Sequence, residues 1–222
     1  MKKNFTMKNK IYPKTYGRRR GRMKKSKINK YMKQLDYFKY SSNKLNTNQI
    51  LEIGSGNGEN VINLSRLYNH HHIVASEVYI DGNISLIHKL LKYSITNVSI
   101  FTENCFFLLE NLPKNIINEI WVLYPDPWPK KKHYKRKLIN KTFIKLLNHC
   151  LKKNGKIYIA TDDNNYFIDI LSEIHESGLF KWENHFPYLW LNPFDNMAQT
   201  TYYKKSLKNG RKSYFMIFSK NI

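Results

Sequence analysis

The sequence predicts an α/β fold with a mainly parallel sheet and helices on both faces. From about residue 48 onward, short apolar segments alternate with segments whose apolar residues recur near the helical period. Polar residues also follow directly after several of the apolar segments. This placement is typical of the carboxyl edge of a parallel sheet, where ligands bind. We find no internal repeat and no second folded domain in the pattern.

The first half of the predicted sheet begins with an apolar strand that runs into a glycine-rich turn. In the first predicted helix Val61, Leu64 and Tyr68 lie near helical spacing, and in the second Ile84, Ile87 and Leu91 lie on one face. The predicted strands are 49–53, 72–76 and 98–101, and the predicted helices are 59–69, 81–92 and 105–111.

The second half continues the alternation and closes on a strand. Ile139, Phe143, Leu146 and Cys150 align on one face of a long predicted helix. The predicted strands are 119–124, 156–160 and 214–218, and the predicted helices are 136–152 and 165–177. Because strands and helices alternate, we expect most strands to pair in parallel.

The most distinctive segment is Pro-Asp-Pro-Trp-Pro at 125–129, directly after a predicted strand. Proline fixes φ and biases the preceding residue away from the α region, so we expect Tyr124, Asp126 and Trp128 to be extended. Six of the eight residues at 130–137 are Lys or Arg. A carboxylate and an indole held beside a cationic patch suit a flat, electron-rich group on a polyanion, such as a base of RNA or DNA.

The net charge of +22, from 38 basic and 16 acidic residues, is unevenly distributed. Residues 1–35 hold fourteen of the basic residues and no acidic one. The other clusters are 130–137 and the set Lys204, Lys205, Lys208, Arg211 and Lys212. This distribution predicts a flexible, RNA-binding arm at 1–33 and one folded domain at 34–222. The alternative is a solvated basic face without a partner.

The cysteines, the apolar runs and the histidines indicate which cellular compartment and which kinds of site to expect. Cys105 and Cys150 form no C-x-x-C pattern and lie in apolar surroundings, so we expect reduced cysteines in a cytoplasmic protein. No apolar run approaches the ~20 residues that span a bilayer, and the basic N-terminus lacks the apolar stretch of a secretory signal. The histidines at 70–72 have no acid or cysteine nearby in sequence, so we expect no metal site. No membrane association and no obligate protein partner are expected.

Polar residues stand at the ends of the predicted strands: Glu52, Glu77, Asn104, Asp126 and 161–163. Glu59 at the start of the first core helix disfavours a phosphate at the G-x-G-x-G turn, 54–58. A nucleoside without phosphate, such as S-adenosylmethionine, suits this turn better. Glu77 lies 21 residues after Gly56, the usual offset for an acid that binds ribose hydroxyls. The glycine turn on its own is equally compatible with a simple tight βα connection.

Together these segments resemble the bacterial tRNA (guanine-N7)-methyltransferase family. The resemblance rests on Leu51–Gly58, Ser76–Glu77, Thr161–Asp162 and, most specifically, on the run from Pro125 to Arg136. It covers the chain from about residue 35 onward. It implies a Rossmann-like, S-adenosylmethionine-dependent methyltransferase fold, and methyl transfer to N7 of a guanosine in the variable loop of tRNA.

The resemblance also implies roles for individual residues. The methyl-donor site would be lined by Glu52, Gly54, Gly56, Glu77, Asn104 and Asp126. Asp126 would also be the catalytic residue, acting by orientation and charge, since guanine N7 has no proton to lose. The substrate guanosine would be contacted by Lys130, Asp162, Thr200, Thr201, Tyr202 and Tyr203.

Three positions depart from the family pattern. Asn104 stands where the family usually has Asp, Asn57 where it often has Lys, and Tyr203 where it has Glu. Loss of that glutamate removes an acceptor for guanine N1–H and the exocyclic amine, which shifts base recognition to Asp162 or Asp163. The alternatives are a methyltransferase for another RNA or for a base amino group, and a non-catalytic RNA-binding protein with a degenerate donor site.

Overall fold

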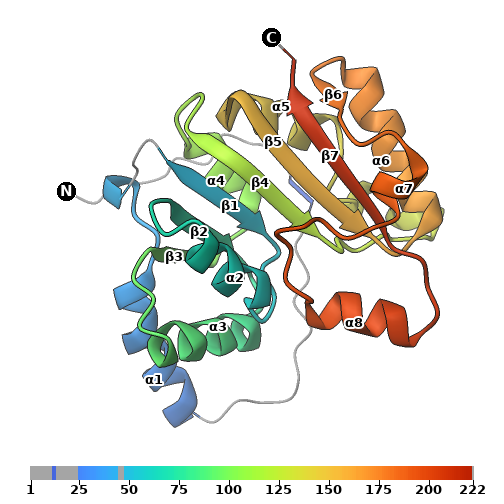
Figure 1. Cartoon of the computed structure of the whole chain (residues 1–222). Helices are drawn as coiled ribbons and strands as arrows, with labels where there is room; N and C mark the ends of the chain where they lie inside the picture. The colour runs from blue at the N-terminus through green and yellow to red at the C-terminus, as the bar shows by residue number, and fades with distance from the viewer. Residues whose placement is uncertain (1–11, 14–24, 45–47, 222) are drawn as a thin grey trace.

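The computed structural model describes residues 12–13, 25–44 and 48–221 of the chain. Its helices and strands follow one another as Figure 1 shows. The helices are α1 (Lys25–Phe38), α2 (Glu59–Leu67), α3 (Ile80–Lys92), α4 (Cys105–Asn111), α5 (Lys141–Cys150), α6 (Asn164–Ser177), α7 (Pro187–Trp190) and α8 (Thr201–Lys208), with short 3₁₀ segments η1 (Ser42–Lys44) and η2 (Lys131–Arg136). The strands are β1 (Gln49–Ile53), β2 (His72–Ser76), β3 (Val98–Phe101), β4 (Ile117–Leu123), β5 (Leu151–Thr161), β6 (Phe180–Trp182) and β7 (Tyr214–Lys220).

The strands form one sheet in the order β3-β2-β1-β4-β5-β7-β6. The first five strands along the chain pair in parallel, and β7 is antiparallel to both β5 and β6. The strand order reverses between β1 and β4, whose residues Ile53 and Val122 are partners near the carboxyl ends. Ligands bind at such a topological switch point in open parallel sheets, so the fold itself directs attention to the segments after β1 and β4.

Helices cover both faces of the sheet, because alternate strand residues point to opposite sides. Leu51, Ile120 and Ile157 belong to the core cluster that also contains α4, α5 and α6 residues. Ile50 and Trp121, their neighbours in sequence, belong to the cluster formed with α1, α2 and α3. The predicted parallel sheet with two helical layers is confirmed by this arrangement.

Helix α1 lies across the expected boundary between residues 33 and 34. Its residues Tyr31, Leu35 and Phe38 are buried and pack in the same cluster as α3. The folded part described by the structure therefore begins before residue 34. Most of the expected arm, residues 1–11 and 14–24, lies outside the described residues.

Most predicted element ranges agree with the structure, and the clearest error is the helix expected at 136–152. Helix α5 begins only at Lys141, because the Asn140 side chain accepts hydrogen bonds from the N–H groups of Thr142 and Phe143 and caps the helix there. It ends at Cys150, where β5 begins five residues earlier than predicted. Cys105 and Cys150 are free and buried, as expected.

Candidate functional site

A glycine loop joins β1 to α2 at the switch point. Gly54, Gly56 and Gly58 have positive φ angles of 76°, 52° and 76°, which glycine adopts without strain. A Cβ atom at Gly58 would lie 2.5 Å from Cδ1 of Leu86 in α3. The loop therefore needs glycine both for its backbone path and for its close packing against α3.

Glu77 holds this loop from the end of β2. One carboxylate oxygen accepts the Gly56 N–H at 2.8 Å, and the other accepts the Tyr79 N–H at 2.8 Å. Burial raises the pKa of Glu77, the backbone N–H groups lower it, and the nearby Asp126 carboxylate adds a smaller upward contribution. Glu77 follows β2 and Asp126 follows β4, the two parallel neighbours of β1, so both lie at the same edge of the sheet, as the alignment of strand ends predicted.

Glu52 lies behind the glycine loop and is only 2% exposed. Asn60 Nδ2 donates to its carboxylate at 3.3 Å. Desolvation raises the pKa of Glu52 to about 8, a shift that the hydrogen bond from Asn60 opposes and the neighbouring Glu59 and Glu77 reinforce. Asn60 Oδ1 accepts the N–H of Ala198 at 3.0 Å, so this amide also links the buried acid to the segment before α8.

The proline segment after β4 departs from its expected conformation. Tyr124 and Trp128 have φ angles of +55° and +45°, so the prediction that they are extended is wrong. Contacts hold the uncommon angle of Tyr124: its N–H donates to Ala160 O at 2.7 Å, and its hydroxyl donates to Ser213 Oγ at 3.1 Å. Asp126 itself is exposed between them, at the carboxyl edge of the sheet.

Part of the basic run is engaged within the protein. The Arg136 guanidinium lies 5.0 Å from the Trp128 ring centroid, and His133 meets the same ring edge-on. Lys137 forms an ion pair with Asp169 and lies 3.9 Å from the Tyr134 ring centroid. The exposed cations of this run are Lys130, Lys131, Lys132 and Lys135. The run therefore has an inward part that supports the proline segment and an outward part that faces solvent.

Asn104 caps α4 directly after the segment that follows β3. Its Oδ1 accepts the Phe106 N–H at 3.1 Å, and its Nδ2 donates to Pro13 O at 2.9 Å. Tyr12 stacks on Phe106 with a centroid distance of 4.7 Å. This pair of N-terminal residues covers Asn104, a contact that nothing in the sequence pattern indicated.

The segment expected to contact guanosine begins α8 and packs onto the glycine loop and the start of α2. Thr200 caps the helix by accepting the Tyr203 N–H at 3.2 Å, and Thr201 donates to the Glu59 carboxylate. A Cβ atom on Gly56 would lie 3.7 Å from the Tyr202 ring. Tyr203 is half-buried, and its ring meets Phe215 edge-on with the centroids 5.9 Å apart. The departure from Glu to Tyr thus places a phenol against β7.

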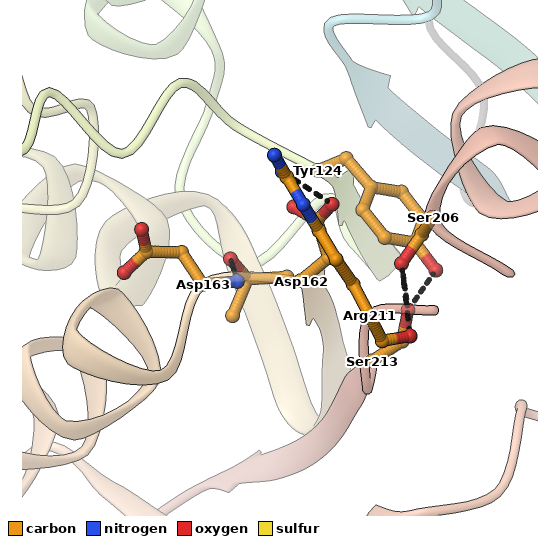
Figure 2. A network of polar contacts seen from close by, with 7 residues as sticks. Tyr124, Asp162, Asp163, Ser206, Arg211 and Ser213 are labelled. Carbon is orange, nitrogen blue, oxygen red and sulfur yellow. Dashed lines mark hydrogen bonds and ion pairs between the residues drawn. The ribbon is translucent and has the colours of Figure 1, made fainter. Parts of the chain in front are cut away.

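Asp162, at the end of β5, forms an ion pair with Arg211, whose Nη1 lies 3.2 Å from Oδ2 (Figure 2). Asp162 also contributes to the raised pKa of Tyr124, after burial and Tyr203, so these groups lie near one another. Asp163 caps α6 by accepting the Tyr166 N–H at 2.8 Å. Sequence reasoning assigned Arg211 only to a basic cluster and missed this pairing.

The structure therefore assembles most of the sequence-predicted site. Glu52, Gly54, Gly56, Glu77 and Asp126 surround the switch point, and Thr200–Tyr203 lie against the same loop. Lys130 is exposed at the start of η2, where no described contact joins it to the rest. Within the described ranges, no cluster of three or more His, Cys, Asp or Glu could hold a metal ion, and no helix is long and apolar enough to cross a membrane.

Known proteins share this sequence pattern. A family model described as "Putative methyltransferase" matches residues 46–216. A tRNA (guanine-N(7)-)-methyltransferase of Neorickettsia sennetsu is 32% identical over 179 residues, which are 79% of this chain and 79% of that protein. The chain belongs to the tRNA (guanine-N(7)-)-methyltransferase family. The resemblance predicted from the glycine loop and the proline segment is confirmed by these matches.

Some of the proteins that this chain resembles are longer. A bifunctional methyltransferase of Rickettsia prowazekii is 32% identical over 213 residues, which cover 94% of this chain. The chain spans 40% of the length of that relative.

Solved structures confirm the predicted methyltransferase fold. An rRNA methylase of Streptococcus thermophilus superposes with a TM-score of 0.53 at 13% identity, covering 91% of this chain and all of that one (100%). A phosphoethanolamine N-methyltransferase of Haemonchus contortus, in complex with S-adenosyl-L-methionine, gives a TM-score of 0.52 at 12% identity, covering 87% of this chain and 53% of that one.

Proposed function

We propose that this protein transfers a methyl group from S-adenosylmethionine to N7 of a guanosine in the variable loop of tRNA. The observation that carries the proposal is that Glu77 and Asp126 follow β2 and β4, the two parallel neighbours of β1, and so lie at the same carboxyl edge of the sheet as the glycine loop. Glu77 holds the glycine loop, and Asp126 belongs to the Pro-Asp-Pro-Trp-Pro segment that typifies the family. Donor and acceptor groups would therefore meet at Asp126.

The residues around the glycine loop fit the donor. Glu77 offers carboxylate oxygens for ribose hydroxyls at the end of β2. Ser55 Oγ is buried in the loop and has no hydrogen-bond partner among the described residues. A buried hydroxyl without a partner is costly, and a bound ligand would satisfy it. When bound, S-adenosylmethionine would supply a methyl carbon activated by a cationic sulfonium, which the carboxylates Glu77 and Asp126 would favour.

Methyl transfer to guanine N7 needs no general acid or general base. Guanine N7 carries a lone pair and no proton, so the side chains must orient the base and stabilise charge. Asp126 is exposed at the strand end and can accept a hydrogen bond from the purine or balance the positive charge that the purine gains. The prolines on both sides of Asp126 restrict the backbone that carries this carboxylate.

The cationic surface would hold the RNA backbone. Lys130, Lys131, Lys132 and Lys135 are exposed next to Asp126 in sequence. Lys130 would contact the target nucleotide, and the others would contact phosphates, which position the RNA without reading its sequence. The basic arm at 1–33 would add phosphate contacts, and a tRNA substrate accords with the cytoplasmic setting predicted from the sequence.

The test is methyl transfer from labelled S-adenosylmethionine to an unmodified tRNA transcript, followed by chemical cleavage specific for N7-methylguanosine. We expect label in the tRNA and a single cleavage in the variable loop. A transcript with adenosine at the cleaved position is the control and should accept no label. Label on a base amino group, or binding of tRNA without transfer, would support one of the alternative functions instead.

A further inference from the structure

Arg211 and Asp162 form an ion pair at the edge of the proposed base site. Arg211 follows α8, and Asp162 ends β5, so two distant segments meet here (Figure 2). The backbone of Arg211 is anchored: its N–H donates to Ser206 O at 3.1 Å, and its carbonyl accepts from Ser206 Oγ at 3.4 Å. The Arg211 side chain remains 60% exposed, so a ligand can reach it.

This pair lies close to the proline segment. Tyr124, which directly precedes Pro125 and Asp126, has its pKa raised by burial first, and then by the nearby Tyr203 and Asp162. The Tyr124 hydroxyl donates to Ser213 Oγ, which is within 3.1 Å of Ser206 Oγ, so the same polar network reaches the residue that anchors Arg211. Figure 2 shows this chain of contacts from Tyr124 to Arg211.

The chemistry of the pair complements one edge of guanine. The Watson–Crick edge of guanine presents two donors, N1–H and the exocyclic amine, beside one acceptor, O6. A carboxylate only accepts hydrogen bonds, and a guanidinium only donates them. A carboxylate next to a guanidinium therefore matches guanine and mismatches adenine, and binding at this edge leaves N7 open toward the methyl donor. Base edges of unstacked nucleotides are commonly read in this way.

We propose that Arg211 reads O6 of the target guanine while Asp162 accepts from N1–H and the exocyclic amine. The pair takes over the recognition that is lost because Tyr203 stands where the family has glutamate. This inference rests on the proposed function and adds to it a specificity-determining residue, Arg211.

The experiment compares two tRNA substrates that differ at one atom. One has guanosine at the methylated position, and the other has 6-thioguanosine there, in which a weak sulfur acceptor replaces O6. The variants are Arg211→Gln and Arg211→Lys, and the matched control is Lys212→Gln, which removes the neighbouring exposed cation. The readouts are kcat/KM on each substrate and the dependence of tRNA binding on salt.

We expect both Arg211 variants to lose about 10- to 100-fold in kcat/KM on guanosine, the range for a good base contact, and to lose much less on 6-thioguanosine. Lys cannot reproduce the guanidinium fork, so Arg211→Lys should not rescue the loss. Lys212→Gln should lower kcat/KM equally on both substrates and reduce the salt slope by about one.

Two results would overturn the inference. Equal losses on both substrates with a reduced salt slope and rescue by lysine would make Arg211 a phosphate contact. Unchanged kinetics of both variants would make the ion pair a surface feature only. Both results leave the proposed function intact, provided that the wild-type protein methylates N7. Absence of transfer by the wild-type protein would instead refute the proposed function, and the inference with it.

Discussion

The side-chain amide of Asn104 donates a hydrogen bond to the carbonyl of Pro13, which lies 91 residues earlier in the chain. The same amide accepts the Phe106 N–H and so caps α4. An amide can do both, whereas the aspartate usual at this position in the family could cap the helix but could not donate. Asparagine at position 104, in place of the family's aspartate, therefore allows the hydrogen bond to Pro13.

Asn104→Asp should detach Tyr12 and Pro13 and leave α4 in place. Hydrogen exchange of a peptide that contains Tyr12 should become faster, while exchange in α4 should change little. The matched control is Asn154→Asp, which adds the same charge at an exposed position near the amino end of β5, where φ is +64°. Unchanged exchange at Tyr12 in Asn104→Asp would show that the Pro13 contact does not hold the segment.

The sequence predicted the sheet well, and it predicted that Glu77 would lie beside the glycine loop, because both depend on local patterns. Glu77 was located by its offset of 21 residues from Gly56, and the structure joins these two residues directly. Strand ends that align in a parallel sheet also brought Asp126 toward Glu77. These relations follow from topology alone.

The contacts made by Tyr124 and Arg211 could not be predicted in the same way. The rule for residues before proline gave the wrong φ for Tyr124, because contacts with Ala160 and Ser213 from two other strand regions decide it. Arg211 was one basic residue in a cluster until the fold placed it on Asp162. Contacts between residues that are far apart in the chain produce no periodic pattern and no characteristic spacing in the sequence.

Asp126→Ala should strongly reduce methyl transfer without unfolding the protein, since the side chain is exposed. We expect kcat to fall by about 10²–10³, the usual loss when an electrostatic contact to the transition state is removed. Asp126→Asn keeps a hydrogen-bond acceptor and should retain more activity than Ala. Single-turnover transfer to tRNA measures the activity, and circular dichroism checks the fold. Full activity of Asp126→Ala with a native spectrum would show that Asp126 is not the catalytic residue.

Glu52 should make the stability of the protein depend on pH. Burial raises its pKa from 4.5 to about 8, so the folded state keeps a proton that the unfolded state loses between these values. The stabilisation is complete below about pH 4.5 and is lost as the pH rises toward 8. The free energy of unfolding should fall by up to about 1.4 kcal/mol per pH unit in this window.

Urea unfolding of the wild type and of Glu52→Gln at pH 5, 6, 7 and 8 isolates this group, because other titrating groups are common to both proteins. The stability of the wild type relative to Glu52→Gln should decline steadily across the series. Two parallel pH profiles would mean that Glu52 titrates normally in the folded protein.

Gly58→Ala should destabilise the protein more than Gly178→Ala does. Both glycines have positive φ, 76° and 64°, so alanine costs roughly 1–2 kcal/mol of backbone strain at either position. Only at Gly58 would the new Cβ collide with Leu86, at 2.5 Å, whereas nothing lies within 4 Å at Gly178. Overpacking should add about 1–3 kcal/mol and displace the glycine loop, so Gly58→Ala should also weaken donor binding.

Thermal unfolding and calorimetric titration with S-adenosylmethionine compare the two variants directly. Equal losses of stability would show that Leu86 moves to accommodate the extra methyl group. Packing against Leu86 would then not be the reason that position 58 needs glycine.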